Sequence, residues 1–149
     1  MKTIFATIIL FISVLVLQTI TPEITITPVM ADTTDINPNG SSELSMLMRT
    51  MQKFTNEAKA DIKLGKAPGA FPLAFDSIHT AKISENISKS DFYDQFADLY
   101  LMSVKNYTSS TTENRVETYN NMVNACLACH SQHCPGPIPV IRKMIVNVE

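Results

Sequence analysis

Two thiols and an imidazole stand close together near the C-terminal end of the chain. Cys126, Cys129 and His130 form the pattern C-x-x-C-H, which is the attachment signature of c-type haem. On one helical turn the two thiols can reach the two vinyl carbons at one edge of a porphyrin, and the histidine then lies below the iron. We therefore expect one covalently attached haem c, with thioethers at both cysteines and His130 as the proximal, axial iron ligand.

The same residue types also serve other chemistry. A redox-active C-x-x-C pair lies at a helix N-terminus, which lowers the thiol pKa, and in a βαβ unit, whereas this pair lies near the end of a predicted helix. A zinc site needs further ligands at knuckle spacing, and only His133 and Cys134 are near. Cys134 could pair with its copy in a second subunit or remain an unpaired thiol. We assign no catalytic residue, because no Ser-His-Asp arrangement, phosphate loop or H-E-x-x-H motif is found.

The motif is predicted to lie on the last of four helices. Apolar residues recur at helical spacing over about 42–64, 73–83, 91–107 and from about 112 to Pro135. Ser41 or Ser42 offers an N-cap to the first helix, and Gly65 offers a left-handed cap at its end. The apolar residues of the third helix are Phe92, Phe96, Leu99, Tyr100, Val104 and Tyr107. Because no stretch after the N-terminal segment alternates with period two, we expect an all-α fold, an antiparallel four-helix bundle carrying one covalently attached haem.

The first 31 residues have the layout of a secretory signal peptide. A basic start is followed by an uncharged apolar run over 4–20 and by a small-residue exit ending at Ala31. Cleavage there would leave a flexible lead-in over 32–41 and a cytochrome domain over 42–149. The alternative is an uncleaved anchor, because an apolar run of about 17 residues is at the short limit for a spanning helix. We expect a periplasmic domain, in contact with a membrane only if the segment is uncleaved.

The combination of a signal peptide, four predicted helices and a C-x-x-C-H motif near the C-terminus resembles the class II c-type cytochromes. These are cytochrome c′ and its low-spin relatives of the cytochrome c556 kind. The resemblance covers about 42–134 and implies a left-handed four-helix bundle that holds haem between its helices. It also implies that Cys126 and Cys129 form the thioethers and that His130 is the proximal ligand. Class II proteins often carry a basic residue one turn beyond the haem histidine, where this chain has Cys134 followed by Pro-Gly-Pro.

The first helix of that family supplies the residue over the sixth coordination position of the iron. Met51 lies at the centre of the apolar face predicted for 42–64 and Met48 lies on its edge, so we expect Met51, and in second place Met48, as the sixth ligand. His79 is a weaker candidate. A thioether ligand gives six-coordinate, low-spin iron suited to electron transfer, whereas an open or blocked position gives iron that binds NO or CO. The competing interpretation is that both methionines only fill the core.

These expectations favour an electron carrier over an enzyme. The leading prediction is an exported monohaem cytochrome that transfers single electrons between redox protein partners, and the alternative is a five-coordinate haem protein that binds NO or CO. A weak peroxidase ranks last because no distal base or arginine is placed. The formal net charge of −2 and the absence of a Lys/Arg cluster argue against nucleic acid as a partner. A second copy of the chain is another candidate partner.

Overall fold

The computed structural model describes residues 41–84 and 88–147, and every regular element in these ranges is helical. The helices are α2 (Glu43–Lys63), the 3₁₀ helix η1 (Leu73–His79), α3 (Tyr93–Thr108), α4 (Arg115–His133) and α5 (Ile138–Arg142). The predicted all-α class is confirmed for this part of the chain. The predicted signal peptide, 1–31, and all of the predicted lead-in except Ser41 lie outside the described residues. Among the helices described, none has both the length and the apolar character needed to cross a membrane.

Local signals set both ends of α2, which matches the helix predicted over 42–64. Ser42 is the N-cap, and its Oγ accepts a hydrogen bond from the backbone N–H of Ser45 at 3.2 Å. Gly65 follows the last turn with a φ of 68°, a left-handed conformation that costs glycine nothing and strains other residues. Both predicted caps are therefore confirmed, with Ser42 as the N-cap.

Helices α3 and α4 each begin later than predicted, because a polar side chain closes a turn just before the helix. The Oγ of Ser90 accepts the backbone N–H of Phe92 at 3.3 Å, and α3 begins at Tyr93 rather than at 91. The Oδ1 of Asn114 accepts the backbone N–H of Thr111 at 2.9 Å, and α4 begins at Arg115 rather than near 112.

Two short elements also differ from the prediction. The second predicted helix is a 3₁₀ helix, with the backbone N–H of Phe75 bonded to the carbonyl of Pro72 at 2.9 Å, because so short a segment gains few α-helical hydrogen bonds. The short helix α5 follows Pro137 and was not predicted. Pro137 is its N-cap and Pro139 lies in its first turn, where no backbone N–H is needed within the helix.

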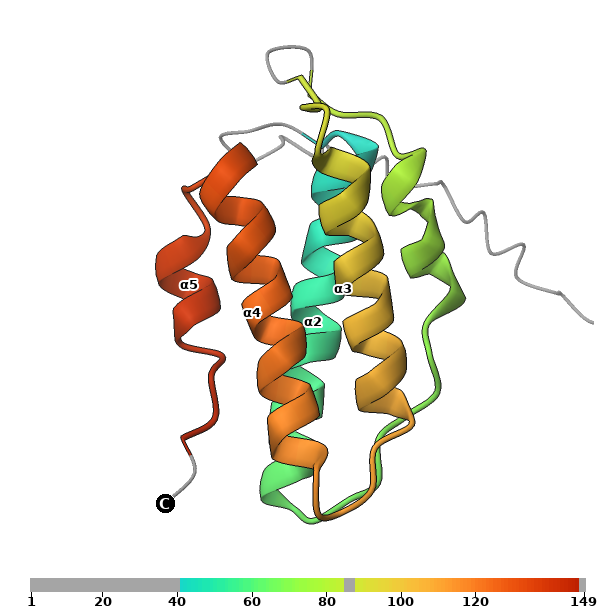
Figure 1. The fold of residues 1–149 in the computed structure, drawn as a ribbon, viewed down its shortest axis with the longest axis vertical. Helices are drawn as coiled ribbons and strands as arrows, with labels where there is room; N and C mark the ends of the chain where they lie inside the picture. The colour runs from blue at the N-terminus through green and yellow to red at the C-terminus, as the bar shows by residue number, and fades with distance from the viewer. Residues whose placement is uncertain (1–40, 85–87, 148–149) are drawn as a thin grey trace, which may run out of the picture. The chain divides into compact units, whose positions relative to one another are not determined.

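The long helices α2, α3 and α4 lie side by side (Figure 1), and ring contacts fix the direction of α3 and α4. The ring of Tyr93, at the start of α3, lies 5.7 Å from that of His133, at the end of α4. At the other end, the rings of Tyr107 and Tyr119 lie 5.8 Å apart. The two helices therefore run antiparallel.

Hydrogen bonds fix the direction of α2 in the same way. Arg115, the first residue of α4, donates from Nη1 to the carbonyl of Lys66, just beyond the end of α2, at 2.7 Å. Further along, the Tyr119 hydroxyl donates to the carbonyl of Thr55 at 3.3 Å. Because α2 and α4 run antiparallel, the first half of α2 lies beside the half of α4 that carries Cys126, Cys129 and His130.

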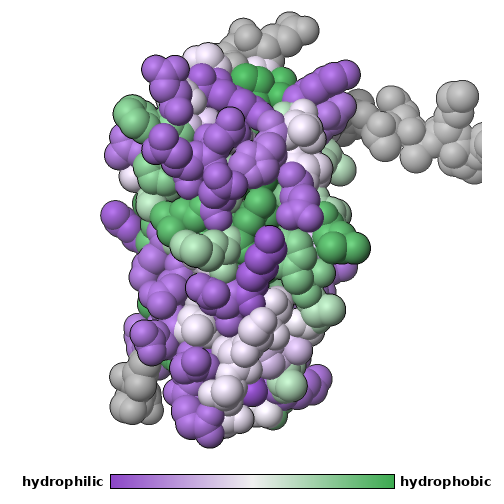
Figure 2. Space-filling model, turned by 45° about the vertical axis from the view of Figure 1, so that its right-hand side comes forward, coloured by the Kyte–Doolittle hydropathy of each residue, from purple (hydrophilic) through white to green (hydrophobic). Residues whose placement is uncertain are grey.

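Helix α3 buries only part of the face predicted for it: Tyr100, Val104 and Tyr107 lie in the core as predicted, whereas Phe92 and Leu99 do not. Phe92 is 61% exposed and Leu99 is 39% exposed. The buried positions of α3 are Tyr93, Ala97, Tyr100, Leu101, Ser103, Val104 and Tyr107. The physical reason is that η1 also packs on α3, since the Tyr93 hydroxyl donates to the Ile78 carbonyl at 3.0 Å. Apolar side chains consequently reach the surface, and Figure 2 shows them in a band across a mostly polar face.

Candidate haem-attachment site on helix α4

The three motif residues lie on the last turns of α4, and their spacing places them on one side of it. Cys126 is partly buried and packs against the core, while Cys129 and His130 are half-buried. All three cysteines in the described part of the chain, including Cys134, are free thiols. The spacing predicted from the sequence therefore brings two thiols and one imidazole together on one stretch of helix.

Burial keeps both motif thiols protonated at neutral pH. Burial first, and the neighbouring Cys129 second, raise the pKa of Cys126 from its ordinary value near 9 to about 12. Burial, with Cys134 as the smaller cause, raises the pKa of Cys129 to about 11. A redox-active pair needs the opposite shift, because the thiolate is the reactive form. The C-terminal end of a helix, where this pair lies, also disfavours a negative charge.

The imidazole of His130 is held by the backbone of Cys134, the C-cap residue of α4. Its Nδ1 lies 2.9 Å from the Cys134 carbonyl oxygen, and the Cys134 N–H donates to the His130 carbonyl at 3.2 Å. A carbonyl oxygen can only accept a hydrogen bond, so Nδ1 carries the proton and Nε2 of the neutral ring keeps its lone pair. Metal-binding histidines commonly have their second ring nitrogen bonded in this way.

Aromatic residues of α3 line the side of α4 that carries the motif. The rings of Tyr93 and Phe96 each lie 5.7 Å from the ring of His133, with edge contacts. Burial first, and the Cys126 thiol second, raise the pKa of Tyr100 well above its usual range. The buried hydroxyl of Tyr100 has no hydrogen-bond partner among the described residues. Such an atom is unusual in a folded protein and calls for an explanation.

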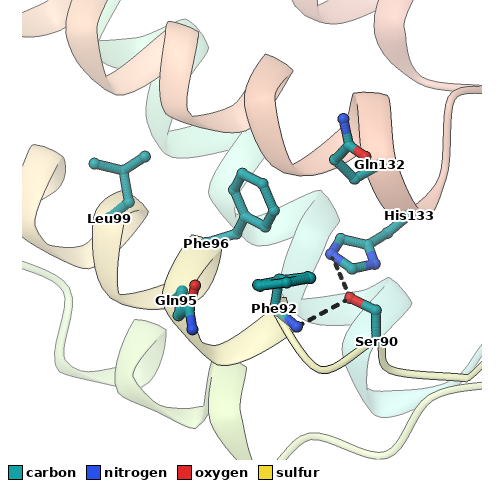
Figure 3. Close-up of a pocket in the computed structure, with 7 residues that line it drawn as sticks. All are labelled: Ser90, Phe92, Gln95, Phe96, Leu99, Gln132 and His133. Atoms are coloured by element: carbon teal, nitrogen blue, oxygen red, sulfur yellow. Dashed lines mark hydrogen bonds between the residues drawn. The ribbon is translucent and has the colours of Figure 1, made fainter.

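A hollow of about 400 Å³ lies between the start of α3 and the end of α4, and none of the three motif residues lines it. Its lining residues, drawn in Figure 3, are Ser90, Phe92, Gln95, Phe96, Leu99, Gln132 and His133. The Nε2 of His133 lies 3.4 Å from the Oγ of Ser90. From the sequence, the apolar residues that line this hollow, Phe92, Phe96 and Leu99, were predicted to lie in the core. Phe92 and Leu99 each directly precede a buried tyrosine of α3. This position at the edge of the buried face is the signal that could have separated them from the core residues.

The two candidate sixth ligands both lie on the first half of α2, beside the second half of α4. Met51 is buried, with 5% of its surface exposed, and Met48 is half-buried against the core. This agrees with the predicted centre and edge of the apolar face. Both side chains therefore lie on the part of α2 that faces the motif-bearing half of the neighbouring helix.

His79, the weaker candidate, lies at the end of η1 and pairs with α3. Its Nδ1 is 3.0 Å from Asp94 Oδ1, and its Nε2 is 3.1 Å from Asp98 Oδ1. Both ring nitrogens are thus engaged by carboxylates at exposed positions. Across 41–84 and 88–147, no group of three or more His, Cys, Asp or Glu side chains is arranged to hold a metal ion.

Comparison with protein-family models, with curated proteins and with solved structures gives no match for this chain. The function proposed next rests on the residues of α4 and their neighbours.

Proposed function

We propose that the chain is an exported c-type cytochrome that binds one haem covalently and transfers single electrons between protein partners. The observation that carries the proposal is that one side of α4 presents two free thiols and an imidazole whose Nδ1 is already bonded. That set supplies what covalent haem attachment requires, because two thiols would hold the porphyrin through thioether bonds and one imidazole would bind the iron. Cys126 and Cys129 would hold the group, and His130 Nε2 would bind the iron.

Covalent attachment needs no redox partner. Each thiol adds its sulfur and hydrogen across one vinyl group, so an S–C and a C–H bond form, an S–H and a C=C π bond break, and no oxidant or reductant is consumed. When bound, the haem iron supplies the one-electron chemistry, and the surrounding residues set its potential through ligation, burial and hydrogen bonding.

The unpartnered hydroxyl of Tyr100 is a further observation that fits a bound group. A buried hydroxyl without a partner costs about 1–3 kcal/mol of stability. Tyr100 is deeply buried and electrostatically coupled to Cys126, so an acceptor belonging to a group attached there would remove this cost. The Tyr107 hydroxyl, near the other end of α3, also has no partner among the described residues, so the fit to a haem rests on the donor set of α4.

The directions of the helices support the finer fold proposal. Helix α2 and α4 run antiparallel, as do α3 and α4, and the Phe75 ring of η1 contacts both Phe54 of α2 and Tyr100 of α3. We infer a four-helix bundle of the class II cytochrome kind, in which η1 takes the place of the second helix. Export through a signal peptide at 1–31 and a periplasmic location belong to the same proposal.

The alternative function is a five-coordinate haem protein that binds NO or CO. The observation that favours it is the burial of Met51 within the core, which is typical of a methionine that fills space. In that case neither Met51 nor Met48 binds the iron. The gas ligand would then take the sixth position.

The first test is an optical spectrum of the protein matured with haem, in ferric and ferrous forms, with and without CO. We expect haem that resists extraction by acid acetone, a low-spin ferric spectrum with a methionine–iron charge-transfer band, and a ferrous form that does not bind CO. The double variant Cys126→Ala/Cys129→Ala should release its haem on extraction. Extractable haem in the unaltered protein would overturn covalent attachment, and high-spin iron that binds CO would favour the alternative function.

A further inference from the structure

We infer that Pro135 is a positioning residue for His130, because it holds Cys134 in the conformation whose carbonyl accepts the Nδ1 proton of the imidazole. The inference deepens the proposed function, in which the opposite nitrogen, Nε2, binds iron. It concerns the haem-free chain as well, since the hydrogen bond is formed by this chain's own atoms.

The geometry requires the chain to leave α4 at one particular residue. In a continuing α-helix, carbonyls point toward the C-terminus, so a carbonyl four residues on faces away from the side chain of His130. Cys134 instead has φ −155° and ψ 82°, which is outside the α-helical region. Its carbonyl therefore turns back to His130 Nδ1, at 2.9 Å, while its N–H still bonds the His130 carbonyl.

The following proline accounts for this conformation. The ring of a proline clashes with a preceding residue in the α-helical region and favours an extended one. Pro135 thus prevents Cys134 from adding another helical residue, and α4 ends at His133. The carbonyl of Pro135 then accepts the N–H of Ile138 at 3.0 Å, which turns the chain toward α5. The hydrogen bond between His130 and the Cys134 carbonyl therefore follows from the position at which α4 ends.

This arrangement needs the backbone of Cys134 and not its thiol. The position one turn beyond the histidine, where the resembling family often has a basic side chain, here contributes a carbonyl acceptor. An acceptor on Nδ1–H makes the imidazole a stronger electron donor through Nε2. We therefore expect the carbonyl to lower the reduction potential of a bound haem, because a stronger donor stabilises ferric iron.

The primary test measures the tautomer of His130 in the full-length, haem-free chain by long-range ¹⁵N–¹H NMR at pH 8. We expect only the Nδ1–H tautomer in the unaltered chain. We expect the same in Cys134→Ala, which removes the thiol but keeps the backbone carbonyl that precedes Pro135. Pro135→Ala should give a mixture in which Nε2–H predominates, as in free imidazole side chains in water. Pro137→Ala is the matched proline control and should keep the Nδ1–H form.

A Pro135→Ala chain that retains only the Nδ1–H tautomer would overturn the inference, as would loss of that tautomer in Cys134→Ala. Circular dichroism of each variant checks that the helices remain, and the Cys134→Ala comparison stands even if Pro135→Ala does not fold. In the haem-loaded protein, Pro135→Ala should raise the midpoint potential while Pro137→Ala leaves it unchanged. If no haem attaches, the NMR result still decides the inference, so its failure and that of the proposed function are distinguishable.

Discussion

The two motif thiols differ in how strongly the folded chain suppresses their ionisation. The pKa of Cys126 is raised to about 12 and that of Cys129 to about 11, and only the thiolate is alkylated. At pH 8 we expect iodoacetamide to modify Cys126 and Cys129 on the order of 100-fold to 1000-fold more slowly in the folded, haem-free chain than in the unfolded chain. Cys129 should react faster than Cys126. Mass spectrometry of peptides containing each cysteine gives the two rates.

The pH dependence of this reactivity and of stability follows from the same shifts. The folded state holds the thiol protons of Cys126 and Cys129 above the ordinary pKa near 9. Their contribution to the free energy of unfolding is therefore complete below pH 9 and is lost as pH rises through about 11 and 12. Alkylation of Cys126 in the folded chain at the rate seen in urea would contradict its burial.

Two tyrosines of α3 offer a matched pair for the unpartnered hydroxyl. Tyr93→Phe removes the hydrogen bond to the Ile78 carbonyl and should lower the free energy of unfolding by about 1–2 kcal/mol. Tyr100→Phe removes a buried hydroxyl that has no partner among the described residues and should leave the haem-free stability unchanged or higher. Urea unfolding of both variants measures this. Equal destabilisation by the two changes would show that the Tyr100 hydroxyl has a partner of its own.

At the scale of whole elements, the proposed function depends on which residue of α2 would lie over the iron of a bound haem. Met51→Leu removes the thioether but nearly keeps the volume, so the cost in stability should stay below about 1.5 kcal/mol. We expect this variant of the haem-loaded protein to change from low-spin to high-spin and to bind CO, whereas the matched Met48→Leu remains low-spin. Optical spectra with and without CO give the answer. A spectral change only in Met48→Leu would reverse the assignment, and high-spin iron in the unaltered protein would favour gas binding.

The elements that could be predicted from the sequence are those with local signals. Ser42 and Gly65 mark α2 because a cap depends on a few neighbouring atoms. The face of α3 could be predicted only in part, since Phe92 and Tyr93 are adjacent and only packing by η1 and α4 decides which is buried. Helix α5 was missed because prolines in its first turn look like helix breakers until the start of the helix is known.

The same distinction applies to the candidate site. The motif could be read directly, because Cys126, Cys129 and His130 are close in sequence. The bond from His130 to the Cys134 carbonyl could not, because it depends on one backbone conformation at the helix end. The unpartnered hydroxyl of Tyr100 likewise appears only when α3 and α4 are packed together.

At the scale of the whole described domain, the C-terminal segment is fastened across α2 and α4. Asn120 bonds the backbone of Val146 twice, as donor to its carbonyl at 2.8 Å and as acceptor from its N–H at 3.0 Å. We expect Asn120→Ala to lower the free energy of unfolding by about 1–3 kcal/mol and to speed carboxypeptidase trimming past Val146. Asn121→Ala, at an exposed neighbouring position, is the control. Equal trimming of both variants would mean that other contacts hold the segment.

Under the proposed function, the burial of Cys126 sets an order of events in the making of the protein. Helices α3 and α4 are joined by the short connection 109–114, and such a hairpin closes within microseconds to milliseconds, far faster than a slow covalent step. Once closed, it covers the thiol and keeps it protonated. Attachment therefore has to happen on an open chain, and the newly exported, unfolded polypeptide is the form that the haem-attaching machinery must meet.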